Sequence, residues 1–260
     1  MPRLAANLSM MFNEVPFLDR FAAARKARFD AVEFLFPYEH PAAELRKRLE
    51  GEGLTQALFN MPPGDWGKGE RGIASLPGRQ AEFRDGVKQA LDYAGAMGCR
   101  LVHCMAGIVP PDVPQVTAAS VYAANLAWAA EQAAAAGVLA VVEPINQRDI
   151  PGYLLKTQEE GAALVEAIGR DRIGLQFDIY HCQIAQGDLT KRMERLMPLI
   201  AHMQLADVPQ RNEPGTGEIN WEYVFGQIDA SGYDGWVGCE YRPAGDTKAG
   251  LAWRERYHVT

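Results

Sequence analysis

Cysteine and histidine are scarce in this sequence, with four and five copies among 260 residues. No two cysteines form a CxxC pair, and all four lie in or beside predicted core segments. That distribution is typical of buried thiols in a reducing cytoplasm and argues against a disulfide framework. A DNA-repair endonuclease on a barrel scaffold would need more histidine ligands for zinc than the chain supplies.

An excess of positive charge is also missing. The chain has 26 Lys and Arg against 33 Asp and Glu, which gives a net charge of −7. Proteins that bind a phosphate backbone usually show a basic stripe or a high pI. We therefore expect no nucleic-acid partner.

Long apolar runs are absent, since the sequence contains no 18 consecutive apolar residues. Its first residues, MPRLAANLSMMF, form a strand-like run without a basic leader followed by a long apolar stretch. We expect a soluble cytoplasmic protein without a membrane partner. The hydrophobic content of 48% is ample for a core.

Strand-like runs alternate with segments of helical periodicity along the chain. The predicted strands are 4–9, 31–36, 54–61, 101–107, 140–146, 173–181, 200–208 and 236–243. The predicted helices are 17–29, one that begins at Pro41, 79–96, 117–136, 157–168, 188–199 and 221–231, with a short one in the tail. Thr157 and Asp188 stand where N-caps are expected.

This alternation repeats about every 30 residues, the usual length of a strand–helix unit. Eight such units predict one α/β domain over residues 1–260, a TIM (β/α)8 barrel. A doubly wound sheet is the main rival, but it usually has fewer strands. The segment 62–77 is a long Gly- and Pro-rich loop, and its GKGERG is a chance match to GxGxxG because no helix follows it.

Each of the last four predicted strands carries one oxygen ligand near its C-terminal end. These residues are Glu143, Asp178, Gln204 and Glu240. A carboxylate within a buried strand is costly unless it is paired or binds a cation. Because active sites of TIM barrels lie at the C-terminal ends of the strands, inward side chains there should converge on one point.

The ligand types predict the ion. Carboxylate and amide oxygens suit Mg²⁺ or Mn²⁺ rather than zinc. The alternative is that these are polar residues of the barrel interior that pair with Arg or Lys. The inward faces of these strands contain few cations, with Arg242 as the clear exception, and this favours the metal.

Five segments are similar to the hydroxypyruvate isomerase family, one of the xylose-isomerase-like TIM barrels. They are FNMPPGDWGKGERGIA, EPINQRDIPGYLLKTQE, LQFDIYHCQIAQGD, HMQLADVPQRNEPGTGEINW and GWVGCEYRPAGDT. The resemblance implies a divalent metal held by Glu143, Asp178, Gln204 and Glu240, with Glu143 and Glu240 as the proton donor and acceptor. Related sugar epimerases have a histidine where this chain has Gln204.

The activity that the resemblance implies is isomerisation of hydroxypyruvate to 2-hydroxy-3-oxopropanoate. A 2-oxo-tetronate isomerase and a ketose 3-epimerase are the nearest alternatives, and a metal-free binding module is the alternative outside enzymes. The substrate would be a small hydroxy-keto acid. Barrels of this kind often self-associate, so a homo-oligomer stays open, although the sequence carries no interface signal.

Four further residues are candidates for binding the substrate. His181 could hydrogen-bond a substrate oxygen or support the metal carboxylates, and Asp149 could contact the substrate or be a solvated loop charge. The loop 62–77 is long enough to act as a lid. Its Lys68 and Arg71 could reach a substrate carboxylate, or they could be solvated basic residues.

Overall fold

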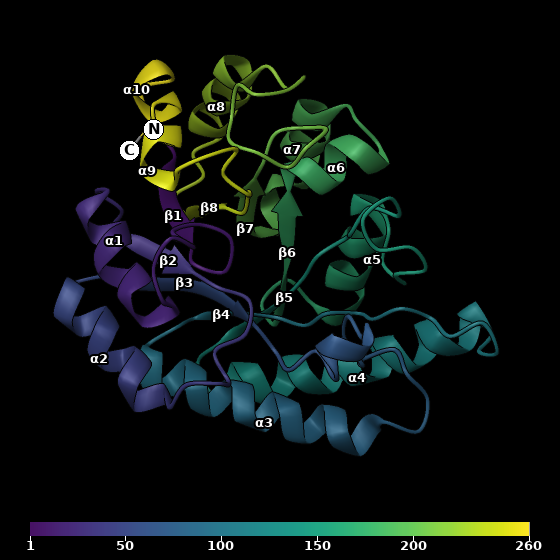
Figure 1. Ribbon diagram of the computed structural model, residues 1–260. Helices are drawn as coiled ribbons and strands as arrows, with labels where there is room; N and C mark the ends of the chain where they lie inside the picture. The colour runs from purple at the N-terminus through teal and green to yellow at the C-terminus, as the bar shows by residue number, and fades with distance from the viewer. Residues whose placement is uncertain (260) are drawn as a thin grey trace.

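The strands of the computed structural model, which describes residues 1–259, close into a parallel barrel in sequence order (Figure 1). They are β1 (Arg3–Asn7), β2 (Ala31–Glu33), β3 (Thr55–Asn60), β4 (Leu101–His103), β5 (Leu139–Val142), β6 (Ile173–Asp178), β7 (Ile200–Leu205) and β8 (Trp236–Cys239). β8 pairs with β1 in parallel and closes the ring. The predicted TIM barrel is confirmed, and the doubly wound sheet is excluded.

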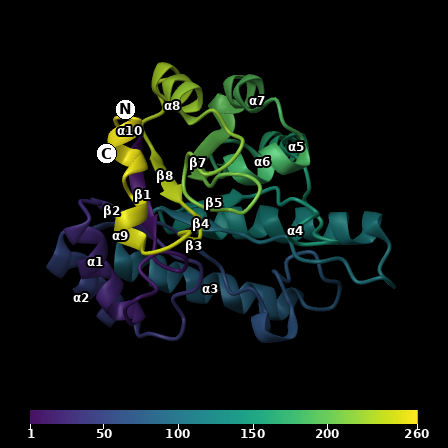
Figure 2. The same cartoon turned by 45° about the horizontal axis from the view of Figure 1, so that its top comes forward.

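Helices surround this barrel in both views (Figures 1 and 2). They are α1 (Arg20–Lys26), α2 (Ala42–Glu52), α3 (Gln80–Met97), α4 (Gln115–Ala135), α5 (Gln158–Ile168), α6 (Ile179–Ala185), α7 (Leu189–Leu196), α8 (Trp221–Ala230), α9 (Thr247–Gly250) and α10 (Trp253–Arg256). Short 3-10 helices occur at Phe17–Asp19, Trp66–Lys68 and Met197–Leu199. None of the helices in the described part of the chain is long and apolar enough to cross a membrane.

Several strands are shorter than their apolar patterns predict. β4 ends at His103 rather than at residue 107, and β8 ends at Cys239 rather than at residue 243. Burial continues beyond both ends, because the loops at the barrel mouth pack over it. An apolar pattern reports burial, and it does not show where the pairing between strands stops.

The strand predicted in the segment 173–181, with His181 just beyond its end, is shorter in the structure. β6 ends at Asp178, and α6 begins at the next residue. The Asp178 side chain caps this helix, since its Oδ1 accepts hydrogen bonds from the backbone N–H groups of Tyr180 (2.7 Å) and His181 (3.1 Å). One carboxylate thus ends a strand and starts a helix.

The two predicted N-caps differ. Thr157 caps α5 in a capping box, in which Thr157 Oγ1 accepts from the Glu160 N–H and Glu160 accepts from the Thr157 N–H. Asp188 also stands directly before its helix, but it has a left-handed backbone with φ of 51°. Within residues 1–259 its side chain makes no cap hydrogen bond, so only its position was predicted correctly.

Candidate active site

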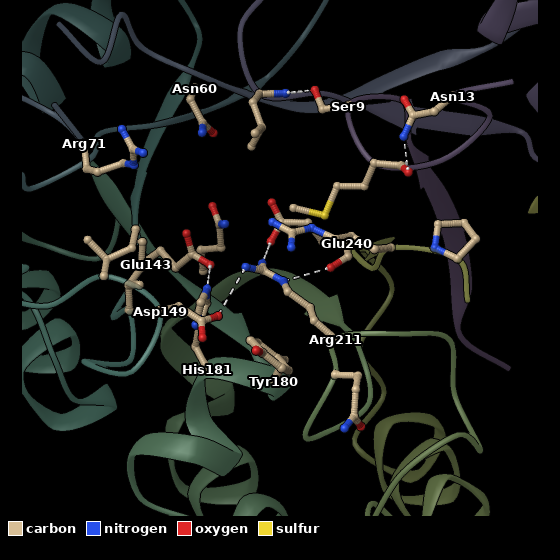
Figure 3. Close-up of a pocket in the computed structure, with 18 of the residues that line it drawn as sticks. Ser9, Asn13, Asn60, Arg71, Glu143, Asp149, Tyr180, His181, Arg211 and Glu240 are labelled. Carbon is tan, nitrogen blue, oxygen red and sulfur yellow. Dashed lines mark hydrogen bonds and ion pairs between the residues drawn. The ribbon is translucent and has the colours of Figure 1, made fainter. Parts of the chain in front are cut away.

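A cavity of about 740 Å³ opens at the C-terminal ends of the strands. Its lining comes from loops around the whole barrel, with Ser9 and Asn13 after β1, Asn60 at the end of β3, and Glu143 and Glu240 directly after β5 and β8 (Figure 3). This is the end of the barrel where the sequence predicted the site.

Three of the predicted ligands meet at the base of this cavity, and two of them, Glu143 and Glu240, line it. Glu143, Asp178 and Glu240 are buried, and together with His181 each contributes an atom to a cluster whose atoms all lie within 4.8 Å of one another. Carboxylates from the C-terminal ends of β5, β6 and β8 therefore converge, as the barrel geometry predicts.

Gln204 lies on β7 beside this cluster, in register with Asp178 of β6. It is buried, and it is not among the described residues that line the cavity. Its Oε1 accepts a hydrogen bond from Gln176 Nε2 (2.6 Å), and its Nε2 donates to Glu33 Oε1 (2.9 Å). Gln204 belongs to a polar layer below the carboxylates.

Burial perturbs the acidic groups. Desolvation, followed by the charges of Glu240 and Asp178, holds the pKa of Glu143 well above its usual 4.5. Burial also raises the pKa of Glu240 to about 8, although the nearby Arg211 opposes the shift. The pKa of Asp178 is raised by burial and lowered in part by Arg211. Such a cluster strongly favours a neutralising ligand, either protons or a cation.

Arg211 is a site residue that the sequence reading missed. It comes from the loop after β7, and its Nη2 pairs with Glu240 Oε2 and lies 3.5 Å from Asp178 Oδ2. Its guanidinium lies over the Tyr180 ring, 4.8 Å from the ring centroid. The only signal in the sequence was an arginine in a loop that follows a ligand-bearing strand.

A buried aspartate holds the loop that carries Arg211. Asp207 accepts hydrogen bonds from the backbone N–H groups of Val208 (2.9 Å), Gly215 (2.8 Å), Gly217 (2.9 Å) and Ile219 (3.2 Å). A Cβ at Gly217 would overlap the Val208 carbonyl. This tight loop fixes the position of the Arg211 backbone.

Arg211 supplies a cation from a loop, whereas the predicted scarcity of cations concerned the inward faces of the strands alone. The alternative prediction, in which the carboxylates pair with Arg or Lys, is therefore partly correct. Arg211 nevertheless carries one positive charge against the three carboxylates of the cluster. Oxygen atoms also stay without partners, because Glu143 Oε1 and Asp178 Oδ2 accept no hydrogen bond from the described residues. Buried oxygens of this kind fit a hard divalent cation.

His181 presents a donor to the cluster. Its Nδ1 lies 2.7 Å from Asn146 Nδ2, and the Asn146 carbonyl oxygen accepts from the Asp149 N–H (2.9 Å). That bond leaves the Asn146 amide N–H to donate to Nδ1, so the proton of the neutral ring is on Nε2. Nε2 lies 3.7 Å from Asp178 Oδ2 and 3.9 Å from Glu143 Oε1. Burial, followed by the charge of Arg211, lowers the pKa of His181 well below 6.5, so the ring is neutral near neutral pH.

Two of the other three predicted substrate-binding residues line the cavity. Asp149 lines the cavity, and its Oδ2 lies 3.8 Å from Arg211 Nη1. Arg71 also lines it, with its guanidinium 3.8 Å from the centroid of the Trp66 ring. Lys68 is not among the described lining residues, is 84% exposed and pairs with Asp65 (2.8 Å).

Comparison with known proteins first identifies the protein family of the chain. Residues 21–257 match the model of the xylose isomerase-like TIM barrel family. The chain belongs to this family.

Individual relatives then show which members of the family the chain resembles. The chain is 55% identical to a 2-oxo-tetronate isomerase of Cupriavidus necator, over 99% of both chains. It is 44% identical to a hydroxypyruvate isomerase of Escherichia coli, over 99% of this chain and 100% of the other. A crystal structure from Brucella melitensis described as an AP endonuclease of family 2 is 48% identical, with a TM-score of 0.96 over 99% of both chains. The predicted resemblance to hydroxypyruvate isomerases, and with it an enzyme of the isomerase class, is confirmed.

Proposed function

We propose that this protein interconverts hydroxypyruvate and 2-hydroxy-3-oxopropanoate with the help of a divalent metal. The observation that carries the proposal is the buried cluster of Glu143, Asp178 and Glu240 at the mouth of the barrel, in which one oxygen of Glu143 and one of Asp178 accept no hydrogen bond from residues 1–259. Relatives named hydroxypyruvate isomerase and 2-oxo-tetronate isomerase support the reaction type.

The metal would be Mg²⁺ or Mn²⁺, held by Glu143, Asp178, Gln204 and Glu240. When bound, it would polarise the substrate carbonyl and stabilise the negative charge that develops when the neighbouring carbon loses a proton. The donor set fits, since it offers only oxygens. His181 is left out of the set because its Nε2 carries the proton.

Glu143 and Glu240 would move the protons. Both line the cavity, whereas Asp178 is not among the described lining residues. One carboxylate takes a proton from the hydroxymethyl carbon and returns it to the adjacent carbonyl carbon. The other moves the hydroxyl proton to the former carbonyl oxygen, so that no atom is gained or lost. Burial raises the pKa of both carboxyl groups in the metal-free protein, so each of them is able to hold a proton near neutral pH.

The cavity also holds groups for the rest of the substrate. Arg71 is the predicted carboxylate partner that reaches the cavity, and we propose it for this role rather than Lys68. The Nε2–H of His181 would donate to a substrate oxygen. Asp149 lies on the same side as His181 in Figure 3 and would accept from a substrate hydroxyl. Arg211, between Asp149 and Glu240, would stabilise negative charge on the oxygens.

A four-carbon acid is the second candidate. A cavity of about 740 Å³ has room for more than a three-carbon substrate, and the relative that is 55% identical is named 2-oxo-tetronate isomerase. Turnover of hydroxypyruvate, 2-oxo-tetronate and C5 to C6 ketoses should be measured with Mg²⁺ and with Mn²⁺. Turnover of the four-carbon acid without turnover of hydroxypyruvate would replace our first choice.

Nuclease activity does not fit this chain, although one similar structure carries that description. The chain has a net charge of −7 and five histidines. A phosphate backbone would meet a cavity with three buried carboxylates at its base. An assay on DNA with abasic sites tests this directly, and cleavage that depends on Glu240 would contradict the isomerase proposal.

A further inference from the structure

A fourth buried carboxylate lies below the cluster. Glu33 is at the end of β2 and is 1% exposed, and its side chain crosses the barrel interior to β7. Its Oε1 accepts from Asn7 Nδ2 (3.0 Å) and from Gln204 Nε2 (2.9 Å), and its Oε2 lies 2.7 Å from His202 Nε2. Glu33 is therefore satisfied by protein groups, in contrast to Glu143 and Asp178.

Gly238 makes this crossing possible. It lies on β8, and a Cβ there would overlap both carboxylate oxygens of Glu33. β8 and β1 separate β7 from β2 in the ring, so Glu33 reaches Gln204 only across a residue without a side chain. The contact joins residues 171 positions apart in the chain.

Glu33 also determines which way two amides face. A carboxylate only accepts hydrogen bonds, so the Gln204 NH₂ group must face Glu33 and the Gln204 carbonyl oxygen must face away. That oxygen accepts from Gln176 Nε2 (2.6 Å), which orients the second amide. Gln176 Oε1 is then left buried and without a partner among residues 1–259, on a residue that lines the cavity.

We propose that Glu33 is a positioning residue that fixes the amide orientation of Gln204 and, through it, of Gln176. As a result Gln204 keeps a carbonyl lone pair for the metal, and Gln176 offers an acceptor to a hydroxyl group of the substrate or to water. The part that concerns the metal rests on the proposed function. The amide orientation itself does not, because the hydrogen bonds that carry it are present without an ion.

The first test uses the metal-free protein. The side-chain NH₂ resonances of Gln204, assigned by their loss in Gln204→Met, should exchange slowly with solvent in the wild type. In Glu33→Gln the new amide can donate as well as accept, so we expect these resonances to shift and to exchange faster. Gln56→Met is the matched control, since Gln56 is a buried barrel amide that donates to the Leu58 carbonyl (2.8 Å). It should leave the Gln204 resonances unchanged.

The second test measures Mn²⁺ affinity by calorimetry. Residues that orient metal ligands typically change affinity by roughly 10- to 100-fold when replaced, and we expect a loss of this size in Glu33→Gln. Gly238→Ala should act in the same direction because its methyl group displaces the Glu33 carboxylate. In a Gln204→Met background, Glu33→Gln should cause no further loss, whereas a general structural role would add its effect.

The outcomes separate the two proposals. Unchanged Gln204 resonances in both Glu33→Gln and Gly238→Ala overturn the positioning role. Changed resonances with unchanged Mn²⁺ affinity support the orienting role and remove Gln204 from the ligand set. A wild type that binds no Mn²⁺ overturns the proposed function, and the resonances of the metal-free protein still decide the role of Glu33.

Discussion

The two polar layers inside the barrel bury carboxylates in opposite ways. In the upper layer Glu143 and Asp178 each keep an oxygen without a hydrogen-bond partner among the described residues, and their pKa values are raised. In the lower layer both oxygens of Glu33 have protein partners. The difference indicates that the upper layer is built to bind a group that is not part of the protein. The lower layer, in contrast, holds side chains of the protein in place.

The largest effect should come from the upper layer. Glu240→Gln removes both a proposed proton-transfer group and a proposed metal ligand, so we expect turnover of hydroxypyruvate to fall by about 10²- to 10⁴-fold. Metal analysis of the purified variant should show a loss of bound ion, and circular dichroism should show an unchanged fold. Activity within a factor of ten of the wild type would contradict the role assigned to Glu240.

Arg211 should come next, because it is the cation that the protein itself supplies to the upper layer. Arg211→Met leaves Glu240 and Asp178 without this partner. We expect kcat to fall on the order of 10²-fold, as when one charge-stabilising donor is removed. Metal binding should also need a higher pH, because the pKa values of both carboxyl groups rise. A change in KM alone would mean that Arg211 only binds substrate.

The pH dependence sharpens the contrast without a mutation. The pKa of Glu240 is raised from 4.5 to about 8 in the folded protein. The metal-free fold therefore holds this proton more tightly than the unfolded chain does. The stability that the proton contributes is full below pH 4.5 and is lost as the pH rises through about 8. Thermal melting of the metal-free protein should show this decline, and it should be weaker in Glu240→Gln.

Metal affinity should have the opposite trend. A cation competes with the proton for Glu240, so Mn²⁺ should bind more tightly at pH 8 than at pH 6 and should release protons into the buffer. Calorimetry in two buffers of different ionisation enthalpy measures that release. Affinity that is flat over this range would show that Glu240 is not a ligand.

The smallest effects should come from the rim of the cavity. Arg71→Met should raise KM about tenfold, a loss of roughly 1.4 kcal/mol, and leave kcat nearly unchanged, because Arg71 is proposed to bind the unreactive carboxylate. Lys68→Met is the matched control from the same loop, and we expect it to change neither constant. Equal effects of the two variants would point to general electrostatic attraction.

Local sequence patterns were sufficient to predict most of the fold. Alternating strand and helix signals predicted the barrel, and Thr157 was correctly predicted as an N-cap from its place before a helical segment. Strand ends were less accurate, since burial persists into the loops that cover the mouth. The start of helix α6 was missed because Ile179 to Cys182 are buried, as the residues of a strand would be.

The candidate site was predictable where one residue per strand carries it. Glu143, Asp178 and Glu240 converge because the barrel repeats, and the repeat is visible in the sequence. Arg211 and Glu33 were not predictable in this way. Arg211 depends on a loop folded around Asp207, and Glu33 depends on the space that Gly238 leaves on a strand more than 200 residues later. Neither dependence leaves a local pattern.

Asp178 has two structural contacts at once, and this limits how the proposed metal ion could be exchanged by design. One of its oxygens holds the first turn of α6, and the other faces the cluster. Substituting a softer ligand there to recruit another metal would loosen the turn that presents His181. Attempts to change the metal preference of the proposed site should therefore begin with Glu143 or Glu240. Neither residue is followed directly by a helix.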